Sequence, residues 1–149
     1  MEAGKDIQKN KISVGLIITN EQLGNSFFPA EIKGEIQKAA YYLLIFISRE
    51  DVVKISCFPT ESKNIKKILI KLEEFSPNLV KGISNVMKDL NLSEDILHTT
   101  GLCYEMQDCY YESYLLGDKL TEDNIKKVNE KFMEIPKVVR VTFEDIPSY

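Results

Sequence analysis

The chain of 149 residues has no tryptophan, one histidine and very little arginine. Its arginines, Arg49 and Arg140, lie far apart in the sequence, and the net charge is −4 with a pI of about 5.1. Proteins that bind nucleic acids usually gather Lys and Arg on one face. We expect the small group of Lys63, Lys66 and Lys67 to be a solvated turn instead. No nucleic-acid partner is therefore expected.

Cysteine and long apolar runs are also scarce. The three cysteines are an odd number, which argues against the disulfide scaffold of a secreted protein. No apolar run approaches the roughly 18 residues that a membrane span needs. The first residues do not have the pattern of a signal peptide. We therefore expect a cytoplasmic protein with no membrane partner.

Motifs of catalysis are missing as well. The sequence contains no glycine-rich phosphate loop, no paired-carboxylate motif and no HExxH. The single histidine, His98, has no nucleophile and carboxylate at the spacing of a catalytic triad. Cys57, Cys103 and Cys109 do not show the Cys-x-x-Cys spacing of a zinc site. We predict that the protein is not an enzyme and has no catalytic residues, metal site or cofactor.

The clearest local signals lie in residues 68–91. Residues 68, 70 and 72 are apolar and share one face of a strand, with Leu69, Lys71 and Glu73 on the other, which is typical of a strand in a half-covered sheet. Ser76 followed by Pro77 predicts a helix start, because the serine caps N–H groups and proline needs none there. Apolar residues then recur at spacings of three and four, and Asn91 suits a left-handed helix stop.

The following residues extend this pattern to a complete domain. Residues 96–104 and 109–115 are rich in Thr, Tyr and Ile and predict a β-hairpin joined by a polar turn at 105–108. Thr121 predicts the cap of a second helix, and residues 138–143 predict a last strand. The expected order is strand, helix, strand, strand, helix, strand.

This order, the segment SPNLVKGISNVMKDLNL and the closing IPKVVRVTFED resemble an ACT domain over about residues 66–146. The resemblance implies a ferredoxin-like βαββαβ unit within the α+β class. It also implies a regulatory domain that commonly binds amino acids. At position 78 the chain has Asn where the loop of this family usually has glycine.

The first functional hypothesis is a homodimeric sensor of an amino acid or another small-molecule effector, acting through a partner protein. Backbone N–H groups at the helix start would hold a ligand carboxylate, and polar residues of the next strand would line the other side. The predicted ligand-binding residues are Phe75, Ser76, Asn78, Leu79, Val80, His98, Thr99 and Thr100. Gly101 either permits a close backbone approach or marks a bulge.

The second hypothesis is a scaffold that binds no ligand. Tyr104, Tyr110 and Tyr114 cluster in the predicted hairpin and are the candidate interface residues for a partner protein. Ordinary cross-strand aromatic pairing explains them equally well, and a free sheet edge is another route to a partner. Asn78 favours the scaffold hypothesis, whereas the polar residues 98–100 favour the sensor hypothesis.

Two cysteines flank the predicted hairpin turn. Cys103 and Cys109 lie opposite each other if the turn is centred on Met106, at a separation that suits a disulfide. One interpretation is a redox switch. The other is a pair of small apolar residues in a sheet, which a reducing cytosol favours.

The N-terminal half has weaker signals. Residues 1–11 are polar and predicted to be disordered, residues 12–62 are predicted to form a ββαβ unit, and residues 63–149 form the ACT-like domain. The elements expected in the ββαβ unit are strands at 12–19, 25–28 and 52–58, a turn at 20–24 and a helix at 31–48, with a linker at 59–64.

The order expected for residues 12–58 equals that of residues 96–144, with Gly15 aligned to Gly101. One interpretation is a degenerate tandem pair of ACT-like units. The other is that any α+β chain can show this order. The strands at 12–19 and 52–58 are apolar enough to need more cover than one small chain provides, so we expect a homodimer.

Overall fold

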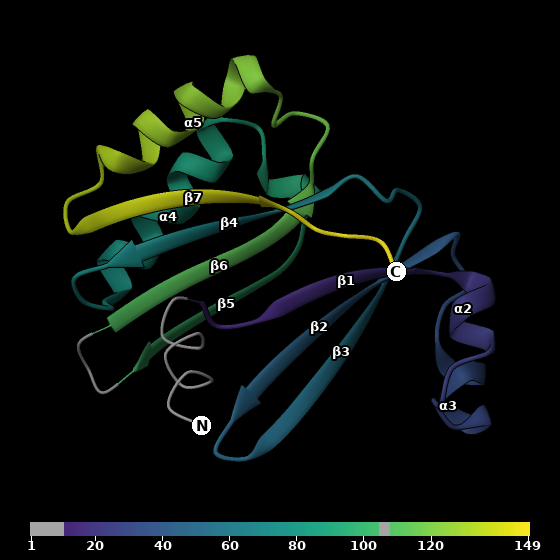
Figure 1. The fold of residues 1–149 in the computed structure, drawn as a ribbon. Helices are drawn as coiled ribbons and strands as arrows, with labels where there is room; N and C mark the ends of the chain where they lie inside the picture. Colours follow the sequence, from purple (N-terminus) through teal and green to yellow (C-terminus); the bar gives the residue numbers. More distant parts are fainter. Residues whose placement is uncertain (1–10, 105–107) are drawn as a thin grey trace. The chain divides into compact units, whose positions relative to one another are not determined.

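A computed structural model describes residues 11–104 and 108–149 of the chain (Figure 1). These residues form an α+β structure with a three-stranded and a four-stranded antiparallel sheet, which confirms the predicted class. The chain divides into two compact units. Unit 1 contains Asn64–Asp145 together with residues 11–12, and unit 2 contains Ser13–Lys63 together with Ile146–Tyr149. The predicted disorder of residues 1–11 falls, except for Lys11, outside the described residues.

Unit 1 has the predicted order of elements. They are β4 (Ile65–Leu72), α4 (Pro77–Asp89), the short 3₁₀ helix η1 (Ser93–Asp95), β5 (Ile96–Tyr104), β6 (Asp108–Leu116), α5 (Glu122–Met133) and β7 (Val138–Asp145). The strands lie in the order β5-β6-β4-β7, and each is antiparallel to its neighbours. This arrangement is consistent with a ferredoxin-like class. The predicted turn at 105–108 lies outside the described residues except for Asp108, which begins β6.

The helix ends of unit 1 confirm the capping predictions. The Ser76 hydroxyl accepts a hydrogen bond from the Leu79 N–H at 3.3 Å, and Pro77 is the first helical residue. Asn91 has a φ of 59°, the left-handed conformation that stops α4. The Thr121 hydroxyl accepts from the Asn124 N–H in the same way at 3.3 Å and fixes the start of α5.

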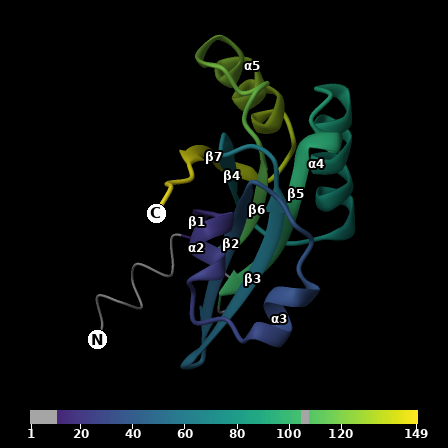
Figure 2. The ribbon, with the colours of Figure 1, turned by 90° about the vertical axis from the view of Figure 1, so that its right-hand side faces the viewer.

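The core of unit 1 lies between one face of its sheet and the two helices (Figures 1 and 2). Because successive side chains of a strand point to opposite faces, Ile68, Ile70 and Leu72 of β4 share this face, where each is buried. Ile83 of α4 and Phe132 of α5 are fully buried against them. Burying a side chain of this size contributes roughly 1.5–3 kcal/mol, so the apolar stripes of the helices account for their docking.

Unit 2 differs from the prediction. Its elements are β1 (Val14–Thr19), α2 (Asn20–Gly24), α3 (Ala30–Glu35), β2 (Tyr41–Arg49) and β3 (Val52–Thr60). The strands form one sheet in the order β1-β2-β3. The predicted ββαβ order is therefore wrong, and so is the tandem repeat built on it, because two short helices follow β1 and two paired strands follow them.

The predicted helix at 31–48 is the main error. Its second half, from Tyr41 on, lies in the central strand β2, which pairs with β1 on one side and β3 on the other. A continuous apolar run fits the spacing of three and four of a helix as well as the spacing of two of a strand, so its periodicity cannot distinguish the two. The aromatic and β-branched residues favour a strand, and the two neighbouring strands supply its hydrogen bonds.

Smaller corrections concern the segments on either side of β2. The predicted turn at 20–24 is α2, capped by Thr19 and Gln22, which bond each other's backbone N–H groups at 3.1 and 2.8 Å. The segment predicted as a return strand, 25–28, belongs to no strand. The predicted linker at 59–64 begins inside β3, which continues to Thr60.

A tight turn joins β2 to β3 (Figure 2). Arg49 pairs with Val52, so only Glu50 and Asp51 form the turn, with φ angles of 49° and 67°. Two residues with positive φ are the signature of the hairpin turn whose twist matches that of the strands.

Within the described residues, no helix is long and apolar enough to cross a membrane.

Candidate functional site

The predicted ligand site depends on the segment between β4 and α4 meeting β5. Phe75, in this segment, lies against Gly101 of β5: a Cβ atom built on Gly101 would stand 2.2 Å from Cζ of Phe75. Gly101 has no positive φ, and the irregularity in the β5–β6 pairing lies between Ile96 and His98. Of the two interpretations of Gly101, close approach therefore holds, and it is the ring of Phe75 that approaches.

The five predicted residues around the helix start differ in accessibility. Phe75 is 41% exposed, Asn78 is exposed and Val80 is half-buried. The hydroxyl of Ser76 is engaged as the helix cap. Leu79 is buried in the core of unit 1. Phe75 and Asn78 are thus the side chains that this segment offers to a ligand.

The three predicted residues on β5 do not share one face. Cys103 packs into the core beneath the helices, so the alternation of the strand places Thr99 and Gly101 on the same side as α4. His98 and Thr100 lie on the opposite face, where the His98 Nε2 and the Thr100 hydroxyl are 2.8 Å apart. The structure therefore brings Phe75, Thr99 and Gly101 together and separates His98 and Thr100 from them.

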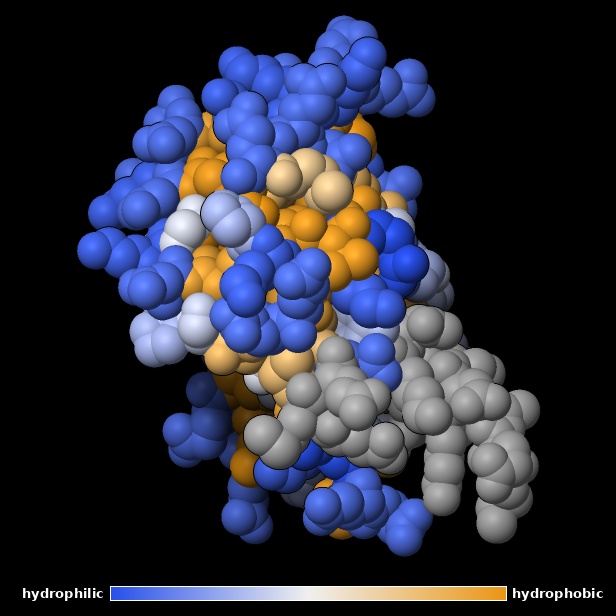
Figure 3. All heavy atoms as spheres, turned by 90° about the vertical axis from the view of Figure 1, so that its left-hand side faces the viewer, coloured by the Kyte–Doolittle hydropathy of each residue, from blue (hydrophilic) through white to orange (hydrophobic). Residues whose placement is uncertain are grey.

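The end of unit 1 that carries Phe75 and Gly101 also has exposed apolar surface. Figure 3 shows the side of the molecule where β4 ends and β7 begins, and orange surface lies there between blue polar residues. Exposed apolar residues in the segments at this end include Phe75, Met133 and Val139. The end of unit 1 that carries the candidate site therefore combines apolar contact area with polar rims.

The face opposite the helices carries a buried ion pair that the sequence interpretation missed. Lys67 and Glu112 are both 0% exposed, and the ammonium and carboxylate are 3.5 Å apart. Lys67 also lies 3.6 Å from the Glu144 carboxylate and 5.4 Å from the centre of the Tyr114 ring. The prediction of a solvated turn is wrong for Lys66 and Lys67, since both are part of β4.

Further contacts hold this polar group. The Ile12 N–H donates to the Glu112 carboxylate at 2.6 Å. His98 lies on the neighbouring strand, and burial lowers the pKa of His98 below 6.5 while the negative charge of Glu112 acts in the opposite direction. With its charges paired inside the protein, the cluster has the character of a structural network.

The predicted tyrosine interface is largely internal. Tyr110 and Tyr114 are each 1% exposed, so their rings are not available to another molecule in this structure. Tyr104 is half-buried, lies edge-on to Tyr110 with ring centres 6.3 Å apart, and donates its hydroxyl to the Lys11 carbonyl at 3.1 Å. Their role as an interface for a partner stays a prediction, and Tyr104 is the only one of the three with accessible surface.

Cys103 and Cys109 form a disulfide. They are direct partners in the β5–β6 register, as the sequence predicted for a turn centred between them. Cys109 is buried in the core and Cys103 packs against it. The bond ties the edge strand β5 to the central strand β6, and the redox switch stays a prediction.

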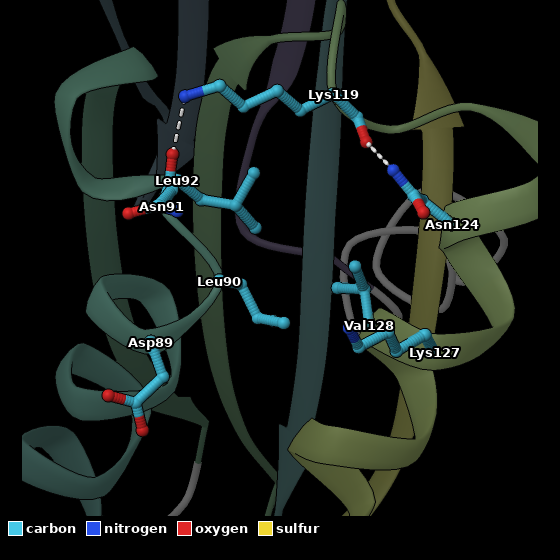
Figure 4. A pocket seen from close by; sticks show the side chains of 8 residues that line it. All are labelled: Asp89, Leu90, Asn91, Leu92, Lys119, Asn124, Lys127 and Val128. Carbon is cyan, nitrogen blue, oxygen red and sulfur yellow. Dashed lines mark hydrogen bonds between the residues drawn. The ribbon is translucent and has the colours of Figure 1, made fainter.

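A cavity of about 270 Å³ lies between the end of α4 and the start of α5 (Figure 4). The Lys119 ammonium donates to the Asn91 carbonyl at 2.6 Å and lies 3.3 Å from the Asp95 carboxylate. The Asn124 amide donates to the Lys119 carbonyl at 3.1 Å. These polar groups are engaged with one another, so they fasten the connection between β6 and α5.

A second cavity, of about 440 Å³, belongs to unit 2 and lies beside α2 and α3. The Lys33 ammonium donates to the Gly24 and Ser26 carbonyls, both at 2.9 Å. The Tyr42 hydroxyl donates to the Gln37 carbonyl at 2.9 Å. As in the first cavity, the polar side chains join neighbouring segments of the unit.

Comparison with known proteins adds no relative: no protein-family model matches the chain, and no curated protein matches its sequence. The interpretation of the site therefore rests on its residues and geometry.

Proposed function

We propose that the protein is a non-enzymatic regulatory protein whose unit 1 is an ACT-like domain that binds an amino acid or a similar small molecule. The contact between Phe75 and Gly101 is the observation that carries the proposal. It places the start of α4 beside β5, as the sensor hypothesis requires. The order of strands in unit 1 gives further support.

The proposed site consists of Phe75, Asn78, Thr99 and Gly101. The carboxylate of the ligand accepts a hydrogen bond from the Asn78 N–H in the first turn of α4, where the helix dipole favours negative charge. Pro77 has no N–H, and the Leu79 N–H is bonded to the Ser76 hydroxyl. The exposed Thr99 hydroxyl supplies a second polar contact, and the partly exposed ring of Phe75 supplies an apolar surface for the rest of the ligand. His98 and Thr100 have no contact with the ligand, because they lie on the other face of β5.

Regulation follows if the ligand changes how the protein binds a partner protein or a second copy of itself. A ligand can shift such an equilibrium only by its difference in affinity for the two states. Contacts that Phe75 makes with both Gly101 and a ligand would couple the position of this segment to ligand binding.

Thermal unfolding in the presence of each amino acid tests the proposal. A ligand present at about a hundred times its dissociation constant adds about 2.7 kcal/mol to the free energy of unfolding. We expect one amino acid or a small group to raise the midpoint, and Thr99→Val to reduce that rise. Thr142→Val, at an exposed threonine of β7, is the matched control and should leave the rise unchanged. No rise with any amino acid would contradict the proposal.

The ligand-free scaffold is the second candidate function. For this function, the edge of β3 is a better surface for a partner than the tyrosine hairpin. Tyr110 and Tyr114 are buried, whereas β3 presents exposed apolar residues along an edge that is unpaired in the described chain. Loss of partner binding or self-association after Ile55→Lys, together with no response to any amino acid, would support the scaffold instead of the sensor.

A further inference from the structure

The two edges of the sheet in unit 2 are different. At the outer edge of β1, the Ile17 N–H donates to the Pro147 carbonyl and the Ile17 carbonyl accepts from the Tyr149 N–H, both at 2.9 Å. At the other edge, β3 pairs with β2 and with no other strand among the described residues (Figures 1 and 2). Residues 147–149 therefore cover part of one edge of this sheet, whereas the edge of β3 carries no further strand in the described part of the chain.

Hydrogen bonds within the sheet determine which residues of β3 face outward. The Asn20 N–H donates to the Ala40 carbonyl at 3.2 Å, so residues of β2 with even numbers turn their backbone groups toward β1. Tyr42 is one of these residues, and its partner in β3 is Pro59. Because Tyr42 makes no hydrogen bonds toward β3, Pro59 and every second residue before it turn their backbone groups away from β2. This agrees with the position of Pro59, since a proline in a sheet belongs where no donor is needed.

The outward backbone groups are thus those of Val53, Ile55 and Cys57. Their N–H and C=O groups form a row that can pair with another strand. Val53 is 59% exposed and Ile55 39% exposed, which is unusual for apolar residues in the middle of a strand. Lys54 is the only charged residue among the nine residues of β3, and Pro59 near the end of the strand is the other residue that discourages pairing at this edge.

Apolar side chains continue from this edge across one face of the sheet. The register places Val14, Phe46 and Ile55 in one row across the three strands. Val14 is exposed and Phe46 is half-buried. The row ends at Ile55, on the open edge.

We propose that two copies of the chain form a dimer by antiparallel pairing of their β3 strands, with Ile55 opposite Ile55 of the second copy. The occupant is a second copy because β3 is self-complementary in this register. Val53 then pairs with Cys57 of the second copy, and Lys54 faces Ser56 of the second copy. The two three-stranded sheets join into one, and the row of Val14, Phe46 and Ile55 continues into its counterpart across the twofold axis.

The neighbouring registers are less favourable. A twofold axis at Lys54 sets two lysines directly opposite each other, which is destabilising. A twofold axis at Ser56 sets Val53 opposite Pro59, which has no N–H to donate. The register centred on Ile55 avoids both problems. The proposal goes beyond ligand binding and does not depend on it, since no residue of the ligand site belongs to β3.

The mass in solution is the first test. Sedimentation equilibrium at micromolar concentration should give twice the chain mass of 17.1 kDa. Ile55→Lys should give a monomer, because it sets two buried like charges opposite each other. Val139→Lys is the matched control, at an exposed β-branched residue of the edge strand β7, and should remain a dimer. A monomeric native chain, or a dimer that survives Ile55→Lys, overturns the proposal.

Cross-linking tests the register and does not depend on disrupting the fold. Val53→Cys places a thiol opposite the native Cys57 of the second copy, so a short bifunctional thiol reagent should link the two chains. Cys57→Ser in the same variant should abolish the link. The proposed register is wrong if the link survives Cys57→Ser, or if Val53→Cys gives no cross-linked chain under conditions where both thiols react.

Discussion

The ring of Phe75 occupies the space in which a side chain at position 101 would begin. A Cβ atom at Gly101 would lie 2.2 Å from Cζ of Phe75 and 2.5 Å from Cε2, well inside van der Waals contact. Phe75 lies between β4 and α4, and Gly101 lies in β5, so their contact holds the segment before α4 against this edge strand.

Gly101→Ala should therefore lower the free energy of unfolding by about 1 kcal/mol, since the Phe75 ring must move outward. Phe75 is partly exposed, so the ring has room to do so. In a Phe75→Ala background the same change should be neutral or stabilising, because alanine then reduces the freedom of the unfolded chain at no steric cost. Urea unfolding of the native chain, the two single variants and the double variant gives the coupling free energy between positions 75 and 101. Equal effects of Gly101→Ala in both backgrounds would show that the contact is absent.

Lys67→Met should be severely destabilising, by about 3–5 kcal/mol, because it leaves the Glu112 carboxylate buried without its cation. Adding Glu112→Leu should recover much of this loss. Lys66→Met is the control: Lys66 is paired with the exposed Asp145, and loss of a surface pair costs about 1 kcal/mol or less. Chemical unfolding measures all three. A Lys67→Met protein as stable as the Lys66→Met protein would contradict the buried pair.

Reduction of the Cys103–Cys109 disulfide should lower stability by about 2 kcal/mol, as expected for a short closed loop. The thermal midpoint should fall when a reductant is added. Cys103→Ser with Cys109→Ser should have the lower midpoint with or without reductant. Cys57→Ser, at the free cysteine, should respond to reductant as the native chain does. A native midpoint that does not depend on reductant would argue against the bond.

His98 should make stability depend on pH. Burial lowers its pKa in the folded protein below 6.5, its usual value in the unfolded chain. Its contribution to stability is therefore complete above 6.5 and is lost as the pH falls through the lower pKa of the folded state. The native chain should lose more stability than His98→Gln over this range, measured by urea unfolding at several pH values. Identical pH profiles would show that His98 is not shielded from water.

Local signals explain why unit 1 could be predicted from the sequence. Ser76, Pro77 and Asn91 determine the ends of α4 through backbone interactions within a few residues, and period two determines β4. These signals do not need knowledge of the rest of the chain. The pairing of Cys103 with Cys109 followed in the same way, since a hairpin defines which residues lie opposite each other.

The errors arise where distant residues decide. Tyr41–Arg49 is apolar without a distinctive period, and its pairing with β1 and β3 makes it a strand. Burial of Lys67 depends on Glu112, which comes from another strand and is far away in sequence.

The division of residues 98–100 between two faces, in contrast, follows from the strand itself. Alternation along β5 therefore already contained the signal that His98 and Thr99 cannot line one site.

The most direct test of the proposed sensor is the map of backbone amide shifts in ¹⁵N-labelled protein titrated with each amino acid. We expect one ligand to perturb Phe75, Asn78, Thr99 and Gly101 together and to leave His98 and Thr100 much less affected. Shifts confined to the cavity between α4 and α5, at Asn91, Leu92 and Asn124, would place a ligand elsewhere. That result, or no saturable shift with any amino acid, would contradict an amino-acid site at Phe75 and Gly101.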